Sequence, residues 1–172
     1  MEEVSRKIRL ALADYKSDIE KEKFQVMISP LFFGNSSISF FDGATNKEQS
    51  GIEIWVKITS LHYYKAFTTT GQGTNIRADM IAFWGVLYLC KRLNLQVIYV
   101  AGETKVVVDW FNEKADLNVL LLQNWKDKVK EICSFFSYIQ VFHIHKTFNS
   151  QVDFLSKYEL SGNNGVLYVE EY

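Results

Sequence analysis

The chain has 172 residues, of which 48% are hydrophobic and 15% aromatic, enough for one packed domain and too many for an intrinsically disordered protein. Nineteen basic and twenty acidic side chains leave a net charge of −1, so the overall charge does not indicate a nucleic-acid or membrane partner. Nine glycines and one proline favour long regular elements over a loop-rich sandwich. No charged leader and no apolar run of about 18 residues stands out, so we expect no signal peptide, no membrane span and an intracellular protein, cytoplasmic or nuclear.

The first 23 residues predict an amphipathic helix. Apolar side chains recur there at steps of three and four residues, with charged residues between them. Pro30, the only proline, marks a joint, so we predict an N-terminal helix and connector over residues 1–30 and one domain over residues 31–172. The apolar stripe of this helix is a candidate contact surface for a protein partner. Its residues are Val4, Ile8, Leu12, Tyr15 and Ile19.

From residue 38 the pattern alternates between strands and helices. Three antiparallel strands are predicted first, at 38–41 with a turn at Asp42-Gly43, at 51–58 and at 61–68. A long helix over 74–94, apolar on nearly every side, then precedes a buried parallel strand at 95–100. Helices at 104–112 and 117–137, a strand at 138–145 and a helix from 149 follow, whereas residues 165–172 fit either an edge strand or a tail. This order predicts an α/β fold with a five-stranded mixed sheet, three antiparallel strands and then two parallel additions, flanked by helices.

Four acidic residues fall where such a sheet binds ligands, beyond the carboxyl ends of its central strands. Asp42 closes the first strand, Asp79 lies early in the long helix, Glu103 follows the fourth strand, and Asp153 begins the last helix. Four carboxylates in one pocket need a compensating cation, and oxygen ligands select Mg²⁺ or Mn²⁺ rather than zinc. Because helix N-termini favour acidic residues in any case, position alone leaves this metal site as one of two interpretations.

Four segments carry a resemblance to a known family. They are F-D-G-A at 41–44, G-T-N-I-R-A-D at 73–79, A-G-E-T-K-V-V-V-D-W at 101–110 and H-I-H-K-T-F-N-S-Q-V-D at 143–153. In this order they resemble the motifs of the ribonuclease H family, especially the reverse-transcriptase-like ribonuclease H domains common in plant genomes. The resemblance covers roughly residues 38–160 and implies a ribonuclease H-like fold.

The resemblance also implies an activity, the hydrolysis of the RNA strand of an RNA–DNA hybrid with two Mg²⁺ or Mn²⁺ ions. Asp42, Asp79, Glu103 and Asp153 would be the catalytic metal ligands, and His143 would assist proton transfer or product release. His143 also fits a surface imidazole beside His145 in an alternating strand. The candidate substrate-binding residues are Gly43, Thr74, Asn75, Arg77, Lys105 and Asn149, of which Thr74 is equally explained as a helix cap.

The sequence departs from the family at two corners of this quartet. Asp79 stands where the family has Glu, and Glu103 stands where it has Asp. Since a displacement of about 1 Å can lower an enzymatic rate on the order of 100-fold, the exchange leaves two hypotheses besides a nuclease. One is a weakened domain that binds nucleic acid or protein without cleavage, and the other is an architectural domain descended from a retroelement.

Two further features leave an interpretation open. Lys126, Lys128 and Lys130 alternate on one predicted helix beside Trp125, which favours a solvated helix face over a nucleic-acid stripe because alternate positions do not share a face. The segment between the second and third helices is too short for the basic handle of bacterial relatives, so we expect modest affinity for hybrids.

Overall fold

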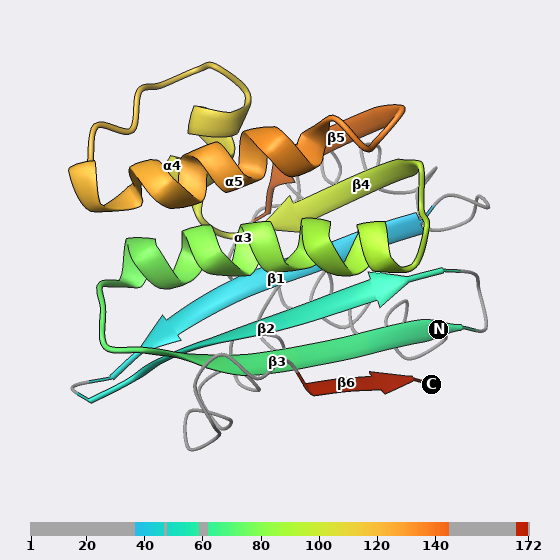
Figure 1. Cartoon of the computed structure of the whole chain (residues 1–172), viewed down its shortest axis with the longest axis horizontal. Coiled ribbons are helices and arrows are strands. Elements are labelled where there is room, and N and C mark those ends of the chain that lie inside the picture. Colours follow the sequence, from blue (N-terminus) through green and yellow to red (C-terminus); the bar gives the residue numbers. More distant parts are fainter. Residues whose placement is uncertain (1–36, 47, 59–61, 145–167, 172) are drawn as a thin grey trace, which may run out of the picture.

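The computed structural model describes residues 37–46, 48–58, 62–144 and 168–171. These residues form a sheet of six strands in the order β5-β4-β1-β2-β3-β6, with helices α3, α4 and α5 over one face (Figure 1). The helix predicted in residues 1–23, the joint at Pro30 and the helix predicted from residue 149 lie outside the described residues. No helix in the described part of the chain is long and apolar enough to cross a membrane.

The first three strands form the predicted antiparallel meander. β1 (Ser37–Thr45) pairs with β2 (Ser50–Lys57), and β2 pairs with β3 (Tyr63–Gly71). The predicted turn at Asp42-Gly43 is wrong, because both residues lie inside β1, opposite Glu53 and Ile52. The chain turns later, where the side chain of Asn46 accepts hydrogen bonds from the backbone amides of Glu48 and Gln49, both at 2.8 Å. Such an Asx turn satisfies backbone groups that the ladder no longer pairs.

Two parallel strands extend the sheet on the other side of β1. β4 (Val97–Gly102) lies beside β1, and β5 (Tyr138–His143) lies beside β4. The connection from β3 to β4 runs through α3 (Asn75–Arg92), and the connection from β4 to β5 runs through α4 (Lys105–Phe111) and α5 (Gln123–Cys133). The expected fold class is therefore confirmed.

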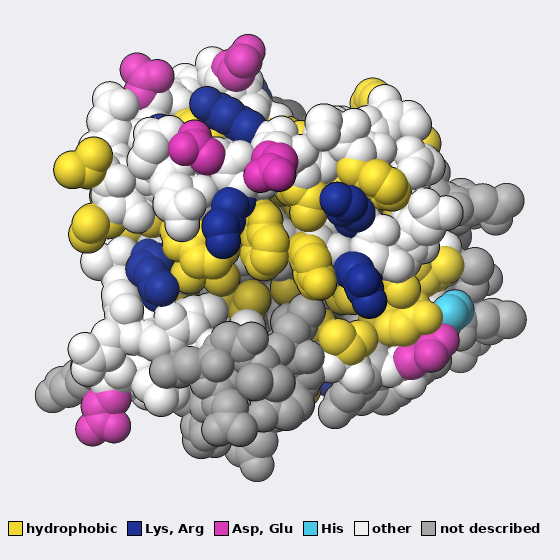
Figure 2. Space-filling model, viewed as in Figure 1, with side chains coloured by type: hydrophobic (Ala, Val, Ile, Leu, Met, Phe, Trp, Pro, Cys, Tyr) yellow, Lys and Arg dark blue, Asp and Glu magenta, His cyan; other side chains and the backbone are white. Residues whose placement is uncertain are grey.

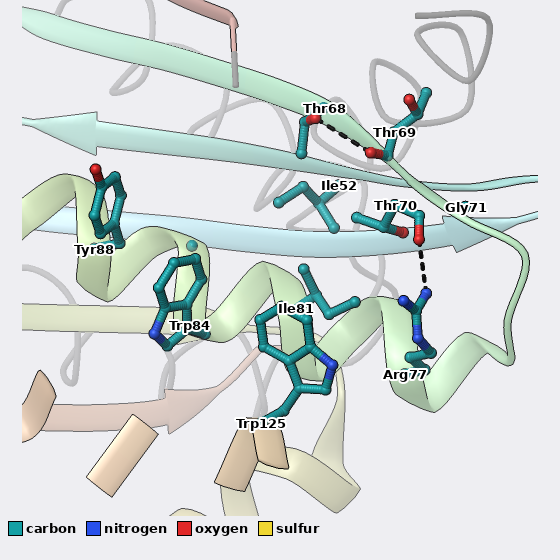
Figure 3. Close-up of a pocket in the computed structure, with 11 residues that line it drawn as sticks. Ile52, Thr68, Thr69, Thr70, Gly71, Arg77, Ile81, Trp84, Tyr88 and Trp125 are labelled. Atoms are coloured by element: carbon teal, nitrogen blue, oxygen red, sulfur yellow. Dashed lines mark hydrogen bonds between the residues drawn. The ribbon is translucent and has the colours of Figure 1, made fainter. Parts of the chain in front are cut away.

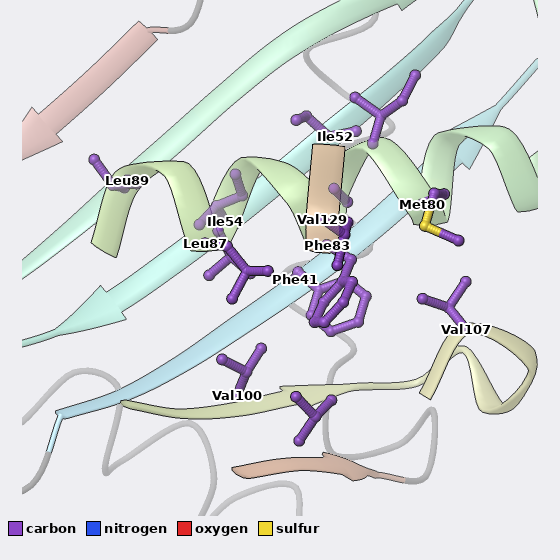
Figure 4. Close-up of a cluster of buried hydrophobic side chains, with 14 of the residues drawn as sticks. Phe41, Ile52, Ile54, Met80, Phe83, Leu87, Leu89, Val100, Val107 and Val129 are labelled. Carbon is purple, nitrogen blue, oxygen red and sulfur yellow. The ribbon is translucent and has the colours of Figure 1, made fainter. Parts of the chain in front are cut away.

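Helix α3 lies across the sheet and supplies the centre of the core (Figure 4). Its buried side chains pack against inward residues of β1 and β2, and the rings of Phe41 and Phe83 lie 5.2 Å apart. Cys90 is fully buried, which raises the pKa of its thiol to about 12, and partial burial raises that of Cys133 to about 11. Both cysteines are free thiols.

The predicted helix over 117–137 is shorter than expected. It begins as a 3₁₀ turn at Leu120–Leu122 and becomes α-helical only over Gln123–Cys133. The carbonyl of Leu117 accepts a hydrogen bond from Nζ of Lys126 at 2.9 Å, which satisfies this carbonyl outside a helix. Leu120 and Leu121 are consequently 88% and 84% exposed.

A sixth strand, β6 (Tyr168–Glu171), pairs antiparallel with β3. The sequence left this segment open between an edge strand and a tail, and the structure settles it as an edge strand. Glu171 accepts hydrogen bonds from Tyr64 and His62, so side chains as well as the backbone attach β6 to the sheet.

Candidate functional site

The predicted site lies at the carboxyl ends of β1 and β4. The parallel register pairs Phe41 with Gly102, so the residues that follow them, Asp42 and Glu103, occupy neighbouring positions at this end of the sheet. Asp42 is only 1% exposed, and Oε2 of Glu103 is buried as well. Adjacent parallel strands thus bring together two carboxylates that are far apart in the sequence.

Asp79 approaches the same place from α3. Its Oδ1 accepts a hydrogen bond from the backbone amide of Gly43 at 3.2 Å. A Cβ atom at Gly43 would lie 2.5 Å from the carbonyl carbon of Ala78, so only glycine permits β1 to pass this close to the helix. Gly43, a candidate substrate-binding residue in the sequence, therefore permits the close approach of β1 to α3.

Asp42 and Asp79 nevertheless face different sides of β1. Phe41 packs against Phe83 of α3, and successive residues of a strand point to opposite faces. The side chain of Asp42 is therefore directed away from α3, on which Asp79 lies. The hydrogen bond from the amide of Gly43 holds the carboxylate of Asp79 at the backbone of β1.

His143 ends β5 directly beside Glu103. Its Nε2 lies 2.9 Å from the carbonyl oxygen of Glu103, and since a carbonyl can only accept, the imidazole donates this hydrogen bond. The ring is exposed and free to face a substrate on its other side. Both interpretations of His143 are compatible with this position, so its catalytic role stays a prediction.

The candidate substrate-binding residues have structural roles of their own. Thr74 caps α3, because its hydroxyl accepts a hydrogen bond from the amide of Arg77 at 3.2 Å, and exposed Asn75 begins the helix. The guanidinium of Arg77 donates to the carbonyl of Thr70 at 2.8 Å. Lys105 donates to Asp109 one helical turn later, and this hydrogen bond holds the pKa of Asp109 below its ordinary value.

Two predicted residues, Asp153 and Asn149, lie outside the described residues. Among residues 37–46, 48–58, 62–144 and 168–171, no three acidic, histidine or cysteine side chains are arranged so that they could hold one metal ion. The described part of the chain therefore pairs the predicted ligands with neighbours, Asp79 with Gly43 and Glu103 with His143, without assembling them into one centre.

The sequence profile of a family described as reverse transcriptase-like matches residues 40–159, from within β1 to the helix predicted from residue 149. The chain belongs to the reverse transcriptase-like family. This confirms the resemblance seen in the four motifs, while the narrower likeness to plant domains stays a prediction. No curated protein sequence matches the chain.

Solved structures with the same fold include ribonucleases H. The ribonuclease H1 of the halophilic archaeon Halobacterium salinarum superposes with a TM-score of 0.65 at 19% identity, over 73% of this chain and 97% of that chain. The LC11 ribonuclease H1, solved in complex with an RNA/DNA hybrid, gives 0.65 at 18% identity, over 73% and 96%. The prototype foamy virus protease-reverse transcriptase gives 0.58 at 15% identity, over 75% of this chain and 21% of that chain. The fold of this reverse transcriptase-like chain is thus the ribonuclease H fold.

Sequence reasoning missed one carboxylate in this family member, that of Glu53. Glu53 lies on β2 directly opposite Asp42 and is 1% exposed. Directly opposed residues of an antiparallel pair have Cβ atoms about 4.5–5.5 Å apart and share a face of the sheet. Part of the signal was available in the segment G-I-E-I-W, where Glu53 alternates with Ile52 and Ile54 and so faces away from these two side chains, whereas its pairing with Asp42 follows from the register of β1 and β2.

The donor chemistry at this end of the sheet fits a divalent cation of the Mg²⁺ type. Asp42 and Glu103 present buried carboxylate oxygens, which are the hard ligands that Mg²⁺ and Mn²⁺ prefer, and two such charges close together need compensation. The residues around them contain no thiolate or imidazole cluster of the kind that selects zinc within the described part of the chain.

Proposed function

We propose that the protein is a metal-dependent endonuclease that hydrolyses the RNA strand of RNA–DNA hybrids. The observation that carries this proposal is the adjacent parallel pair β1 and β4, which places Asp42 and Glu103 side by side and has Asp79 hydrogen-bonded to the next residue of β1. Family membership and the ribonuclease H fold support it. The solved LC11 complex with an RNA/DNA hybrid supports a hybrid as the substrate.

In this proposal Asp42, Asp79, Glu103 and Asp153 would hold two Mg²⁺ or Mn²⁺ ions. When bound, the ions supply a water ready for attack on the scissile phosphate and neutralise the charge that develops there. The water oxygen forms a bond to phosphorus and the bond from phosphorus to the 3′ oxygen breaks, which leaves a 3′-hydroxyl and a 5′-phosphate.

The described residues support this reaction by placement and by exclusion of water. Burial of Asp42 removes competing solvent from its carboxylate, and the amide of Gly43 fixes one oxygen of Asp79. The hydrogen bond from His143 to the carbonyl of Glu103 holds the imidazole at the edge of the site, where it would assist proton transfer or product release. Thr74, Asn75 and Arg77 stand at the exposed start of α3, where they would contact the substrate backbone.

A second candidate is a ribonuclease H-like domain that binds nucleic acid without cleavage. It is favoured by the opposite orientation of Asp42 and Asp79 across β1, and by the exchange of Asp and Glu at positions 79 and 103. The shorter Asp79 reaches the amide of Gly43 from α3, whereas a glutamate there would extend one methylene farther. An architectural domain that uses the N-terminal helix as a protein-contact surface is the third candidate, and full retention of protein partners after deletion of residues 1–23 would count against it.

The nuclease and the binding domain separate in one assay. The full chain is incubated with an end-labelled RNA–DNA hybrid and Mg²⁺ or, separately, Mn²⁺, beside Asp42→Asn and the matched control Asp116→Asn, which changes an exposed loop residue. We expect cleavage by the wild type and Asp116→Asn and a loss of at least about 100-fold in Asp42→Asn. No cleavage with either metal would overturn the nuclease. Activity that appears only in Asp79→Glu/Glu103→Asp would identify the exchange as the cause of a weakened site.

A further inference from the structure

A groove lies between α3, α5 and strand β3 (Figure 3), and we name it the α3–α5 groove. Its volume is about 600 Å³, within the usual size of ligand pockets. Arg77 lines it, whereas Asp79, two positions along α3, points to β1. Because two residues span about 200° around a helix, the groove and the candidate catalytic site lie on different sides of the first turns of α3.

Aromatic rings form one wall of this groove. Trp84 stacks on Tyr88 with ring centroids 5.2 Å apart and an interplanar angle of 22°. The ring of Trp125, from α5, meets Trp84 edge-on at 5.7 Å. Both indoles also pack against the core, which fixes their orientation, and Tyr88 remains 36% exposed. The wall is therefore a set of rigid, partly exposed rings.

Cations stand at the rim of the same wall. Nζ of Lys128 lies 4.7 Å from the ring centroid of Trp125 and 5.6 Å from that of Trp84. Arg77 closes one end through its hydrogen bond to the carbonyl of Thr70 (Figure 3). At the other end, Lys91 and Arg92 line an adjoining hollow of about 430 Å³ that shares Trp84 and Tyr88 with the groove.

The charge of the rim is predominantly positive. Figure 2 shows Lys and Arg side chains set around an apolar strip on the face that carries α3 and α5. Of the residues that line the groove and the adjoining hollow, four are Lys or Arg and one, Glu131, is acidic. This local excess contrasts with the net charge of −1 of the whole chain.

We propose that the α3–α5 groove binds single-stranded nucleic acid, with bases stacked on the Trp84, Tyr88 and Trp125 wall and phosphates beside Arg77 and Lys128. A cationic groove with exposed rings is the arrangement that binds single strands without sequence preference. A duplex is excluded as the occupant because its bases stack on one another and cannot reach a side-chain ring. From Arg77 to Lys91, α3 is about 21 Å long at 1.5 Å per residue, room for about four nucleotides.

The proposal shares Arg77 with the catalytic proposal, but it requires no cleavage and none of the carboxylates. It would let the protein hold an unpaired strand next to a hybrid, on the opposite side of α3 from Asp42 and Glu103. The chain is expected to lack the basic handle of bacterial relatives, and single-strand binding in the groove would replace part of the nucleic-acid affinity that the handle provides. The two proposals fail separately, since Asp42→Asn should abolish cleavage and leave single-strand binding unchanged.

The test measures fluorescence anisotropy of labelled 12-nucleotide oligo(dT) and oligo(U) with the full chain at about 50 mM salt, where phosphate contacts are strong. Lys128→Glu is compared with Lys130→Glu, which makes the same charge change two residues away on α5, outside the groove. We expect Lys128→Glu to weaken binding about 10-fold or more and Lys130→Glu about 2-fold or less, since phosphate contacts are local at this salt.

A second variant separates stacking from charge. Trp125→Leu should weaken single-strand binding several-fold, whereas Trp125→Phe, which keeps a ring, should retain most of the affinity. Thermal unfolding of each variant identifies those that fail to fold. If Trp125→Leu fails to fold, Trp125→Phe keeps the test valid. No binding by the wild type, equal losses in Lys128→Glu and Lys130→Glu, or equal affinity for a blunt duplex would overturn the proposal.

Discussion

Gly43 is the residue on which the contact between β1 and α3 depends. Its missing side chain leaves space for the backbone of Ala78 and Asp79, and a Cβ atom would lie 2.5–2.8 Å from three backbone atoms there. Backbone cannot yield as the end of a flexible side chain can, so the helix would have to move away from the strand. The same movement would break the hydrogen bond from the amide of Gly43 to Asp79.

We therefore predict that Gly43→Ala destabilises the fold by about 3 kcal/mol, measured as the free energy of unfolding in urea. Gly73→Ala is the matched control, because a Cβ there meets only the side chain of Arg77, at 2.8 Å, which can rotate aside. Its effect should stay below about 1 kcal/mol. Equal effects of the two substitutions would show that β1 and α3 are not in close contact.

At the residue scale the sequence predicted positions better than orientations. Glu103 was expected directly after the fourth strand, and it follows β4 in the structure. Asp42 was expected to close the first strand and lies inside β1 instead, and His143 was expected within a strand and is the last residue of β5. The sequence did not predict that Asp42 and Asp79 face different sides of β1. The direction of the Asp42 side chain follows from alternation along β1, and alternation applies only if the strand continues past residue 42. Because a turn was expected at Gly43, neither the alternation of side chains through Asp42 nor the pairing of Asp42 with Glu53 was predicted.

Among the elements, β6 is the addition to the sheet that the family resemblance did not imply. It covers the edge of β3, which would otherwise expose unpaired backbone groups. Glu171 links the two strands, since Tyr64 and His62 donate hydrogen bonds to its carboxylate and thereby lower its pKa below the ordinary value. The ionised form is thus favoured when β6 is attached.

This linkage predicts that β6 detaches from β3 in acid before the sheet unfolds. A folded pKa below the ordinary value stabilises attachment above about pH 4.3 and loses that contribution as the pH falls through the lowered pKa. Amide hydrogen-exchange protection at residues 64–67 of β3 should therefore decrease between about pH 5 and pH 3, while protection in the β1–β2 ladder stays constant. Glu171→Gln should remove this pH dependence, and an unchanged profile in that variant would assign detachment to another group.

Helix α5 shows why element boundaries were predicted less well than element order. The apolar periodicity of residues 117–137 is continuous, yet α5 begins only at Gln123, and Lys126 donates a hydrogen bond to the carbonyl of Leu117 ahead of it. A hydrogen bond between a side chain and a distant carbonyl leaves no periodic trace in a sequence. Trp125, early in α5, lies against Trp84 and so contributes to the wall of the α3–α5 groove, whereas the sequence favoured a solvated helix face beside it.

For the whole molecule, the distribution of charge matters more than its sum. A net charge of −1 provides no long-range attraction for a polyanion, so nucleic-acid affinity must come from local contacts. Two parts of the molecule carry different charges. Buried carboxylates lie at the carboxyl ends of β1 and β4, and cations surround the groove beside α3. A neutral chain can in this way offer one site for cations and another for phosphates.

This division predicts a limited salt dependence of single-strand binding. Each phosphate neutralised on a single strand contributes about −0.7 to the slope of log K against log salt, so four cations at the groove and hollow give a slope near −3. Lys128→Gln should reduce the magnitude of that slope by about 0.7, and Lys130→Gln should leave it unchanged. The measurement is a titration of oligo(dT) at a series of KCl concentrations. A wild-type slope steeper than about −6 would require phosphate contacts well beyond the four cations at the groove and hollow, and would refute the localisation of binding there.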